Sequence, residues 1–155
     1  MGKAVRHDRI PTAKDWAGAE ADLAARHART LLLGKSLDEA LAVFGQGRSI
    51  ERADELRHVP RRPFQYYVFA FATFVRSDAA QGDADSASCF LRLLLWREEA
   101  DPGSVAQVWP RLAPMARAVW GRQAWYEADP AIYGSFVEMG RALEALLGEA
   151  PSCRA

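Results

Sequence analysis

The residues that most often build catalytic or metal sites are few in this chain. Its histidines are His7, His27 and His58, and its cysteines are Cys89 and Cys153. No two histidines stand three or four residues apart, and the cysteines form no C-x-x-C pair, so the spacings typical of zinc sites are missing. We therefore predict no metal centre, and we expect the protein to work without a metal or redox cofactor.

A second pattern joins an arginine to a histidine within one short stretch. Five residues separate Arg52 from His58, in the order Arg-Ala-Asp-Glu-Leu-Arg-His. These residues resemble the R-x(4–6)-H signature of HEPN-type ribonucleases. The resemblance implies that the arginine and the histidine act together on an RNA phosphodiester. It is the enzymatic alternative that the sequence offers, because the motifs of serine hydrolases, P-loop proteins and dinucleotide-binding proteins are absent.

The densest group of basic residues surrounds this pattern and includes Arg57, Arg61 and Arg62. Acidic residues such as Glu51 and Asp54 are interleaved with it, at spacings that allow ion pairs along a helix. The chain as a whole has 20 basic and 20 acidic residues, which does not favour a nucleic-acid partner. Arg57, Arg61 and Arg62 are therefore a second candidate surface for partner binding, suited to an acidic protein whose approach such charges accelerate. The alternatives are a solvated face whose arginines pair with their own acidic neighbours, which the spacing favours, and a helix-turn-helix-like surface that reads DNA.

A third group combines two aromatic side chains with an arginine. Arg122, Trp125 and Tyr126 follow a predicted helix, and Trp125 lies off the apolar stripe of that helix. Trp, Tyr and Arg contribute most to the binding energy of protein interfaces. We predict that these three residues bind a protein partner. The alternative is that Trp125 packs against the helix that follows and belongs to the core.

The elements that must position these residues are helices, and the most hydrophobic of them runs from Phe64 to Val75. This stretch holds four Phe, two Tyr and two Val. A helix that is apolar nearly all round is buried, and this one is shorter than the about 20 residues that cross a bilayer. A second apolar run follows after a polar linker. We therefore predict a central antiparallel helical hairpin over 62–76 and 87–99.

Capping signals place the other helices. Thr12 is predicted to cap a helix over 13–33, which turns an apolar side with Leu23 to the core, and Ser36 opens a capping box. Asp-Pro pairs at 101–102 and 129–130 are each predicted to begin a helix, because Asp accepts from a free amide and Pro has no amide to leave unpaired. The helix that begins at Pro130 is predicted to be the last one and to end at Gly148.

Length and composition define the domain. A chain of 155 residues is expected to form one domain. The sequence predicts an all-α, single-domain bundle of about seven helices over 13–148, with a flexible N-terminal arm at 1–12 and a frayed C-terminal tail at 149–155. The N-terminus has no apolar signal-peptide region and the cysteines suggest no disulfide framework, so we expect a cytoplasmic protein.

These features favour a non-catalytic protein of the bacterial cytosol that binds another protein. Toxin-neutralising immunity proteins, adaptors and secretion chaperones include small helical proteins of this kind. The expected partner is a cognate toxin or effector, or a second copy of this chain, without a membrane. Two alternatives stay open: the ribonuclease that uses Arg52 and His58, and a sensor that holds a small ligand among the aromatic residues of the central helix.

Overall fold

Two long, largely buried helices form the middle of the computed structural model, which describes residues 8–148. They are α4 (Arg61–Arg76), in which 12 of 16 residues are buried, and α5 (Ala84–Ala100). They run antiparallel, because Phe71 meets Phe90 edge to face at 5.5 Å between ring centroids, while the last turn of α5 lies over the first turn of α4. The predicted central hairpin over 62–76 and 87–99 is thus confirmed.

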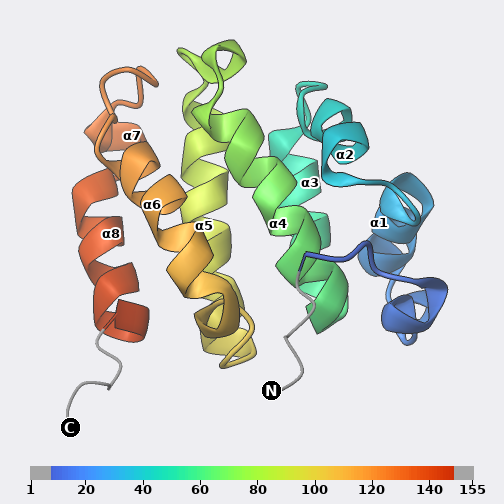
Figure 1. The fold of residues 1–155 in the computed structure, drawn as a ribbon. Coiled ribbons are helices and arrows are strands. Elements are labelled where there is room, and N and C mark those ends of the chain that lie inside the picture. The colour runs from blue at the N-terminus through green and yellow to red at the C-terminus, as the bar shows by residue number, and fades with distance from the viewer. Residues whose placement is uncertain (1–7, 149–155) are drawn as a thin grey trace, which may run out of the picture.

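The other helices pack on both sides of this pair (Figure 1). They are α1 (Leu23–Leu32), α2 (Leu37–Phe44), α3 (Ser49–His58), α6 (Trp109–Trp120), α7 (Pro130–Tyr133) and α8 (Phe136–Leu143). On one side α2 covers α4, α3 covers α5 and α1 packs on α3, while on the other side α6 packs on α4 and α8 on α5 and α6. No strand occurs within residues 8–148, so the all-α prediction is confirmed for that range.

The described part of the chain contains eight α-helices, close to the about seven that the sequence predicts. Short helical turns complete it. The turns are Ala13–Trp16, Ala19–Ala21, Asp78–Ala80, Ala106–Val108 and a π-turn at Glu144–Gly148. None of the helices within residues 8–148 has the length and apolar character needed to cross a bilayer. Residues 1–7 of the predicted arm and the predicted tail at 149–155 lie outside the described residues.

The predicted helix over 13–33 is wrong over its first half. Gly18 has a backbone φ of +97°, a left-handed conformation that glycine adopts easily and that interrupts the helix. Asp22 then caps a new helix by accepting from the amide of Ala25 at 2.9 Å. This break changes the side that faces the core: Leu23, predicted to face inward, is 74% exposed.

Two further predicted boundaries differ from the structure. Asp101-Pro102 does not begin a helix, because Asp101 ends α5. The predicted last helix divides at Gly134, whose φ is +78°, and Ser135 caps α8 by accepting from the amide of Glu138 at 3.2 Å. The predictions at Ser36 and at Asp129-Pro130 are confirmed, since both cap hydrogen bonds form.

Close packing of α8 against α6 yields a first prediction, at Gly140. A Cβ at this position would lie 2.3 Å from the ring of Trp120. We expect Gly140→Ala to lower the free energy of unfolding by about 1–3 kcal/mol, because the overpacked ring must move. The control is Gly45→Ala, whose Cβ would meet Phe74 at an ordinary 3.6 Å. Urea denaturation measures both variants, and a Gly140→Ala protein as stable as wild type would contradict this account.

Candidate functional site

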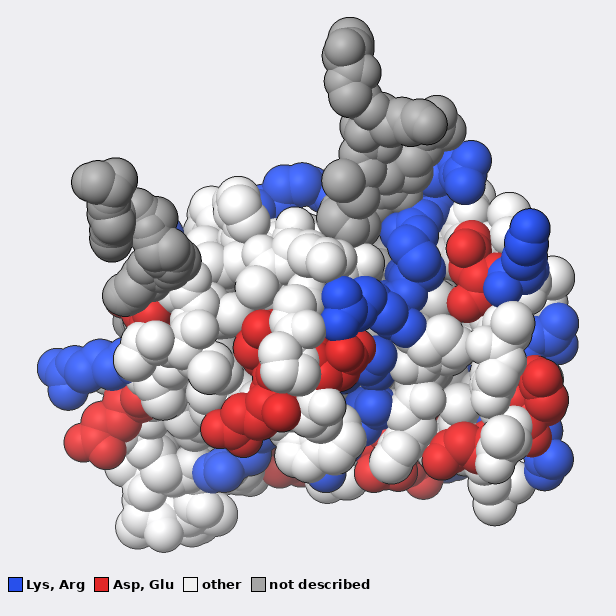
Figure 2. Space-filling model, turned by 90° about the horizontal axis from the view of Figure 1, so that it is seen from below, with Lys and Arg blue, Asp and Glu red and all other residues white. Residues whose placement is uncertain are grey.

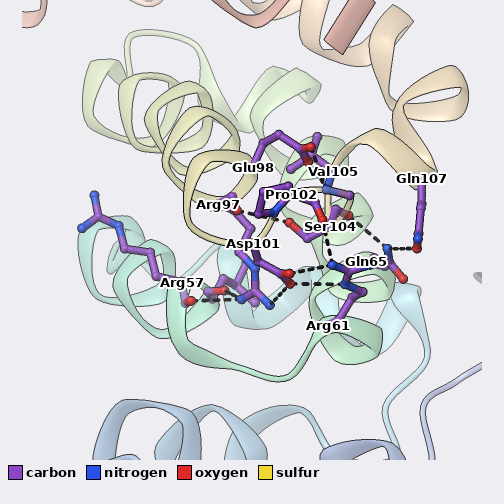
Figure 3. A network of polar contacts seen from close by, with 12 residues as sticks. Arg57, Arg61, Gln65, Arg97, Glu98, Asp101, Pro102, Ser104, Val105 and Gln107 are labelled. Carbon is purple, nitrogen blue, oxygen red and sulfur yellow. Dashed lines mark hydrogen bonds and ion pairs between the residues drawn. The ribbon is translucent and has the colours of Figure 1, made fainter. Parts of the chain in front are cut away.

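A buried arginine lies at the meeting point of three helix ends (Figure 3). Arg97 is 5% exposed, and its Nη1 donates to the carbonyls of Leu56 and Arg57 at 2.9 and 3.0 Å. Its guanidinium lies 4.7 Å from the ring centroid of Phe64, and Nη2 lies 3.7 Å from a carboxylate oxygen of Asp101. Burial lowers the pKa of Arg97, and the charge of Asp101 acts in the opposite direction. Arg97 therefore joins the end of α3 to α4 and α5.

A second arginine of this network, Arg61, was predicted to bind a partner. Its Nη2 lies 2.5 Å from Oδ1 of Asp101, its Nε donates to Oδ2 at 3.2 Å, and Nη2 also donates to the carbonyl of Pro102 at 2.9 Å. These contacts lower the pKa of Asp101 and raise that of Arg61. An acidic partner that approached Arg61 would have to compete with Asp101.

The turn after α5 is held by a buried carboxylate. Glu98 is 7% exposed and accepts from the amides of Gly103, Val105 and Ala106 at 2.7, 2.8 and 3.0 Å. These three bonds supply the capping that the sequence assigned to Asp101. Figure 3 also shows Gln65 of α4 reaching the same turn, where its Nε2 donates to Ser104 and Gln107.

The other predicted basic residues also contact their own chain. The guanidinium of Arg57 lies 5.0 Å from the ring centroid of Trp96, and Nη2 of Arg62 donates to the carbonyl of Arg9 at 3.3 Å. On the face seen in Figure 2, Lys and Arg side chains form a band with Asp and Glu side chains on both sides. The role of Arg57, Arg61 and Arg62 in partner binding stays a prediction.

Arg52 and His58, the pair of the ribonuclease alternative, contact different groups. Arg52 is 5% exposed and forms an ion pair with Glu55, whose other contact is a hydrogen bond with Nδ1 of His27. The partly exposed His58 lies 3.7 Å from a carboxylate oxygen of Asp22. Within residues 8–148 no hydrogen bond joins Arg52 to His58, and the side chain of Arg52 serves the contact between α1 and α3.

The third predicted group is a stack on the turn after α6. The guanidinium of Arg122 lies 4.1 Å from the ring centroid of Trp125 and 5.5 Å from that of Tyr126. Tyr126 is fully buried, and its hydroxyl donates to the carbonyl of Val75 at 2.7 Å. Burial raises the pKa of Tyr126. Trp125 is half-buried against the core, so Arg122 and the exposed part of Trp125 are what a partner could contact.

A hollow between α1 and α3 was not anticipated from the sequence. It measures about 520 Å³, and two large exposed apolar side chains line it, Leu23 at 74% and Ile50 at 62% exposure. The sequence does not predict this hollow, because the predicted helix over 13–33 places Leu23 in the core. The signal in the sequence for an exposed Leu23 is the helix break at Gly18, followed by the capping residue Asp22. The lining is Leu23, Ala24, His27, Ile50, Glu51, Asp54 and Glu55.

The Arg61–Asp101 pair yields a prediction about pH. Because Arg61 holds the pKa of Asp101 below its unfolded value of about 3.9, the pair stabilises the protein above that pH and loses its effect as the pH falls through the lower, folded pKa. We expect Asp101→Asn to lower the melting temperature at pH 7. The difference in melting temperature between the variant and wild type is expected to shrink below about pH 4.

The control for this prediction is Asp78→Asn, since Asp78 is exposed and its side chain makes no hydrogen bond or ion pair within residues 8–148. The control is expected to match wild type at pH 7. If the melting temperature of Asp101→Asn stays below that of wild type by the same amount down to pH 2, the charge of Asp101 does not stabilise the protein.

Within residues 8–148 no group of three or more His, Cys, Asp or Glu side chains is placed to hold a metal ion.

Comparisons with protein-family models, with curated proteins and with solved structures find no match for this chain. Its function is therefore inferred from the geometry of its own side chains.

Proposed function

We propose that this protein is a non-catalytic binding protein of the bacterial cytosol that docks a segment of another protein in the hollow between α1 and α3. The observation that carries the proposal is the exposure of Leu23 and Ile50 on the walls of one hollow. Single exposed apolar residues are common on protein surfaces, whereas neighbouring ones at a concave site are typical of interfaces. Covering such side chains contributes about 25 cal/mol per Å² of apolar surface removed from water.

The charges around the hollow indicate the chemistry of the occupant. Its walls carry the carboxylates of Glu51, Asp54 and Glu55, and no Lys or Arg is among the lining residues. Glu51 is paired with Arg48 at 3.0 Å and Glu55 with Arg52, whereas Oδ1 of Asp54 lies 4.0 Å from Nε2 of His58, so Asp54 is the most available carboxylate. We infer an occupant with apolar side chains flanked by Lys or Arg, since complementary charge speeds association and excludes acidic competitors.

The walls of the hollow are held in place before any partner arrives. His27 of α1 and Glu55 of α3 are hydrogen bonded, and Arg52 fixes the same carboxylate from inside. A site formed in advance loses less conformational entropy on binding. This arrangement supports a docking role and uses Arg52 as part of the scaffold.

The proposal includes a role as an immunity protein, adaptor or chaperone for a toxin or effector. The half-buried, unpaired Cys89 is in keeping with a reducing cytosol. The stack at Arg122 and Trp125 and the basic residues Arg57, Arg61 and Arg62 are second contact candidates on the same partner. No contact within residues 8–148 specifically favours the ribonuclease or the ligand sensor.

The proposal predicts that substitutions at Ile50 and Ile132 differ in effect. Both isoleucines are exposed, at 62% and 72%, but Ile132 lies on α7, outside the hollow. A photo-crosslinking residue placed at position 50 in the native host first identifies the partner. With the purified partner, we expect Ile50→Arg to weaken binding at least about tenfold in calorimetry, because it adds a cation facing a basic segment and removes apolar contact. Ile132→Arg is expected to leave the affinity within about twofold of wild type.

Three outcomes would overturn the proposal. Equal affinity of wild type and Ile50→Arg would show that the hollow is not the docking site. Identical crosslinked products from positions 50 and 132 would show non-specific capture. Crosslinks only to a second copy of this chain would replace the foreign partner with self-association.

A further inference from the structure

Helices α4 and α6 both end at the same end of the bundle (Figure 1), and a second hollow lies between these helix ends. It measures about 390 Å³ and is lined by three arginines, Arg76, Arg117 and Arg122, together with Ala118 and Gly121. Ala118 and Gly121 are small, which leaves the space between the arginines open. No carboxylate is among the lining residues, in contrast to the hollow between α1 and α3.

Most of the hydrogen-bond donors of these arginines have no partner in the described part of the chain. Arg76 is exposed, and its side chain makes no hydrogen bond or ion pair within residues 8–148. Arg117 uses only Nε, which donates to Glu144 at 2.8 Å, and its side chain is 52% exposed. Arg122 uses Nη2, which donates to the hydroxyl of Tyr126 at 3.2 Å, and its Nε is buried without a partner among the described residues.

Contacts behind the hollow fix Arg122 relative to the end of α4. Its guanidinium is stacked on Trp125 and lies near Tyr126, whose hydroxyl donates to the carbonyl of Val75, the residue directly before Arg76. This chain of contacts ties the turn after α6 to the last turn of α4. An arginine held in this way loses little side-chain entropy when it binds an anion.

We propose that the three-arginine hollow binds a phosphate monoester. Three guanidiniums from three positions can each donate to a different oxygen, and a phosphate monoester offers three oxygens where a carboxylate offers two. Glu144 offsets one of the three positive charges, and the remaining two match the charge of about −1.5 to −2 that a phosphate monoester carries at pH 7. A nucleic-acid phosphodiester, with one charge and two free oxygens, fits less well.

The helix ends set a limit on the affinity of this site. The C-termini of α4 and α6 carry partial negative charge, which stabilises the arginines in the empty site but opposes the incoming anion. The site is thus expected to depend on the arginine side chains themselves, so that the loss of one of them has a clear effect. The inference does not rest on the proposed docking role, because the two hollows share no residue.

The test is calorimetric titration of the full-length protein with phosphoserine at constant ionic strength. We expect Arg76→Gln to weaken binding about tenfold, since it removes a charge-assisted contact. Glu144→Gln is expected to strengthen binding, because Arg117 is released. The control is Arg26→Gln, an exposed arginine of α1 outside both hollows, which is expected to bind as wild type does. Tighter binding of a peptide with one phosphoserine than of free phosphoserine would identify a phosphoprotein as the source of the ligand.

Several results would overturn the inference. Equal losses in Arg76→Gln and Arg26→Gln would show a general effect of net charge. Binding of N-acetylglutamate as tight as that of phosphoserine would make the hollow a carboxylate site. A Glu144→Gln protein that binds no better than wild type would show that Arg117 takes no part.

Discussion

The buried charge of Arg97 is the constraint on which the rest of the structure depends. Removing a guanidinium from water costs several kcal/mol unless its donors find partners. Those partners are the carbonyls at the end of α3, which accept from Nη1, the ring of Phe64 on α4, and the carboxylate of Asp101 at the end of α5, which forms an ion pair with Nη2; within residues 8–148 Nε is buried without a hydrogen-bond partner. Because they belong to three helices, satisfying Arg97 fixes how α3, α4 and α5 meet. The turn that follows is fixed in the same region by Glu98, which accepts from three of its amides.

This use of polar residues inside the fold determines which residues remain for function. Arg61 forms an ion pair with Asp101, and Arg52 forms one with Glu55. These two arginines, which the sequence suggests as functional residues, therefore stabilise contacts between helices. The side chains with exposed, uncommitted surface lie elsewhere. Leu23 and Ile50 line one hollow with acidic walls, and three arginines line another without any acid. The two hollows thus differ in the charge of the ligand that each accepts.

The features that follow from short-range pattern could be predicted from the sequence. The apolar character of Phe64–Val75 gave the central helix, and the capping box at Ser36 marked the start of α2. Features decided by distant contacts could not be predicted. Asp101-Pro102 and Asp129-Pro130 carry the same local signal for the start of a helix. The carboxylate of Asp101, however, accepts a hydrogen bond from Arg61, 40 residues earlier, and Asp101 ends a helix instead. The hollow at Leu23 was hidden for a related reason, because a single left-handed glycine at position 18 resets the face that α1 turns to the core.

Hydrogen–deuterium exchange of wild type and Arg97→Met tests most directly whether Arg97 holds the docking face in place. The substitution keeps an apolar stem over Phe64 but leaves the carbonyls of Leu56 and Arg57 without their donor, an unsatisfied state that costs roughly 1–3 kcal/mol. We predict that amides of α3 and of α1, which packs on it, exchange faster in the variant, while the middle of α4 stays protected. Unchanged exchange in α1 and α3 would contradict the central place given to Arg97.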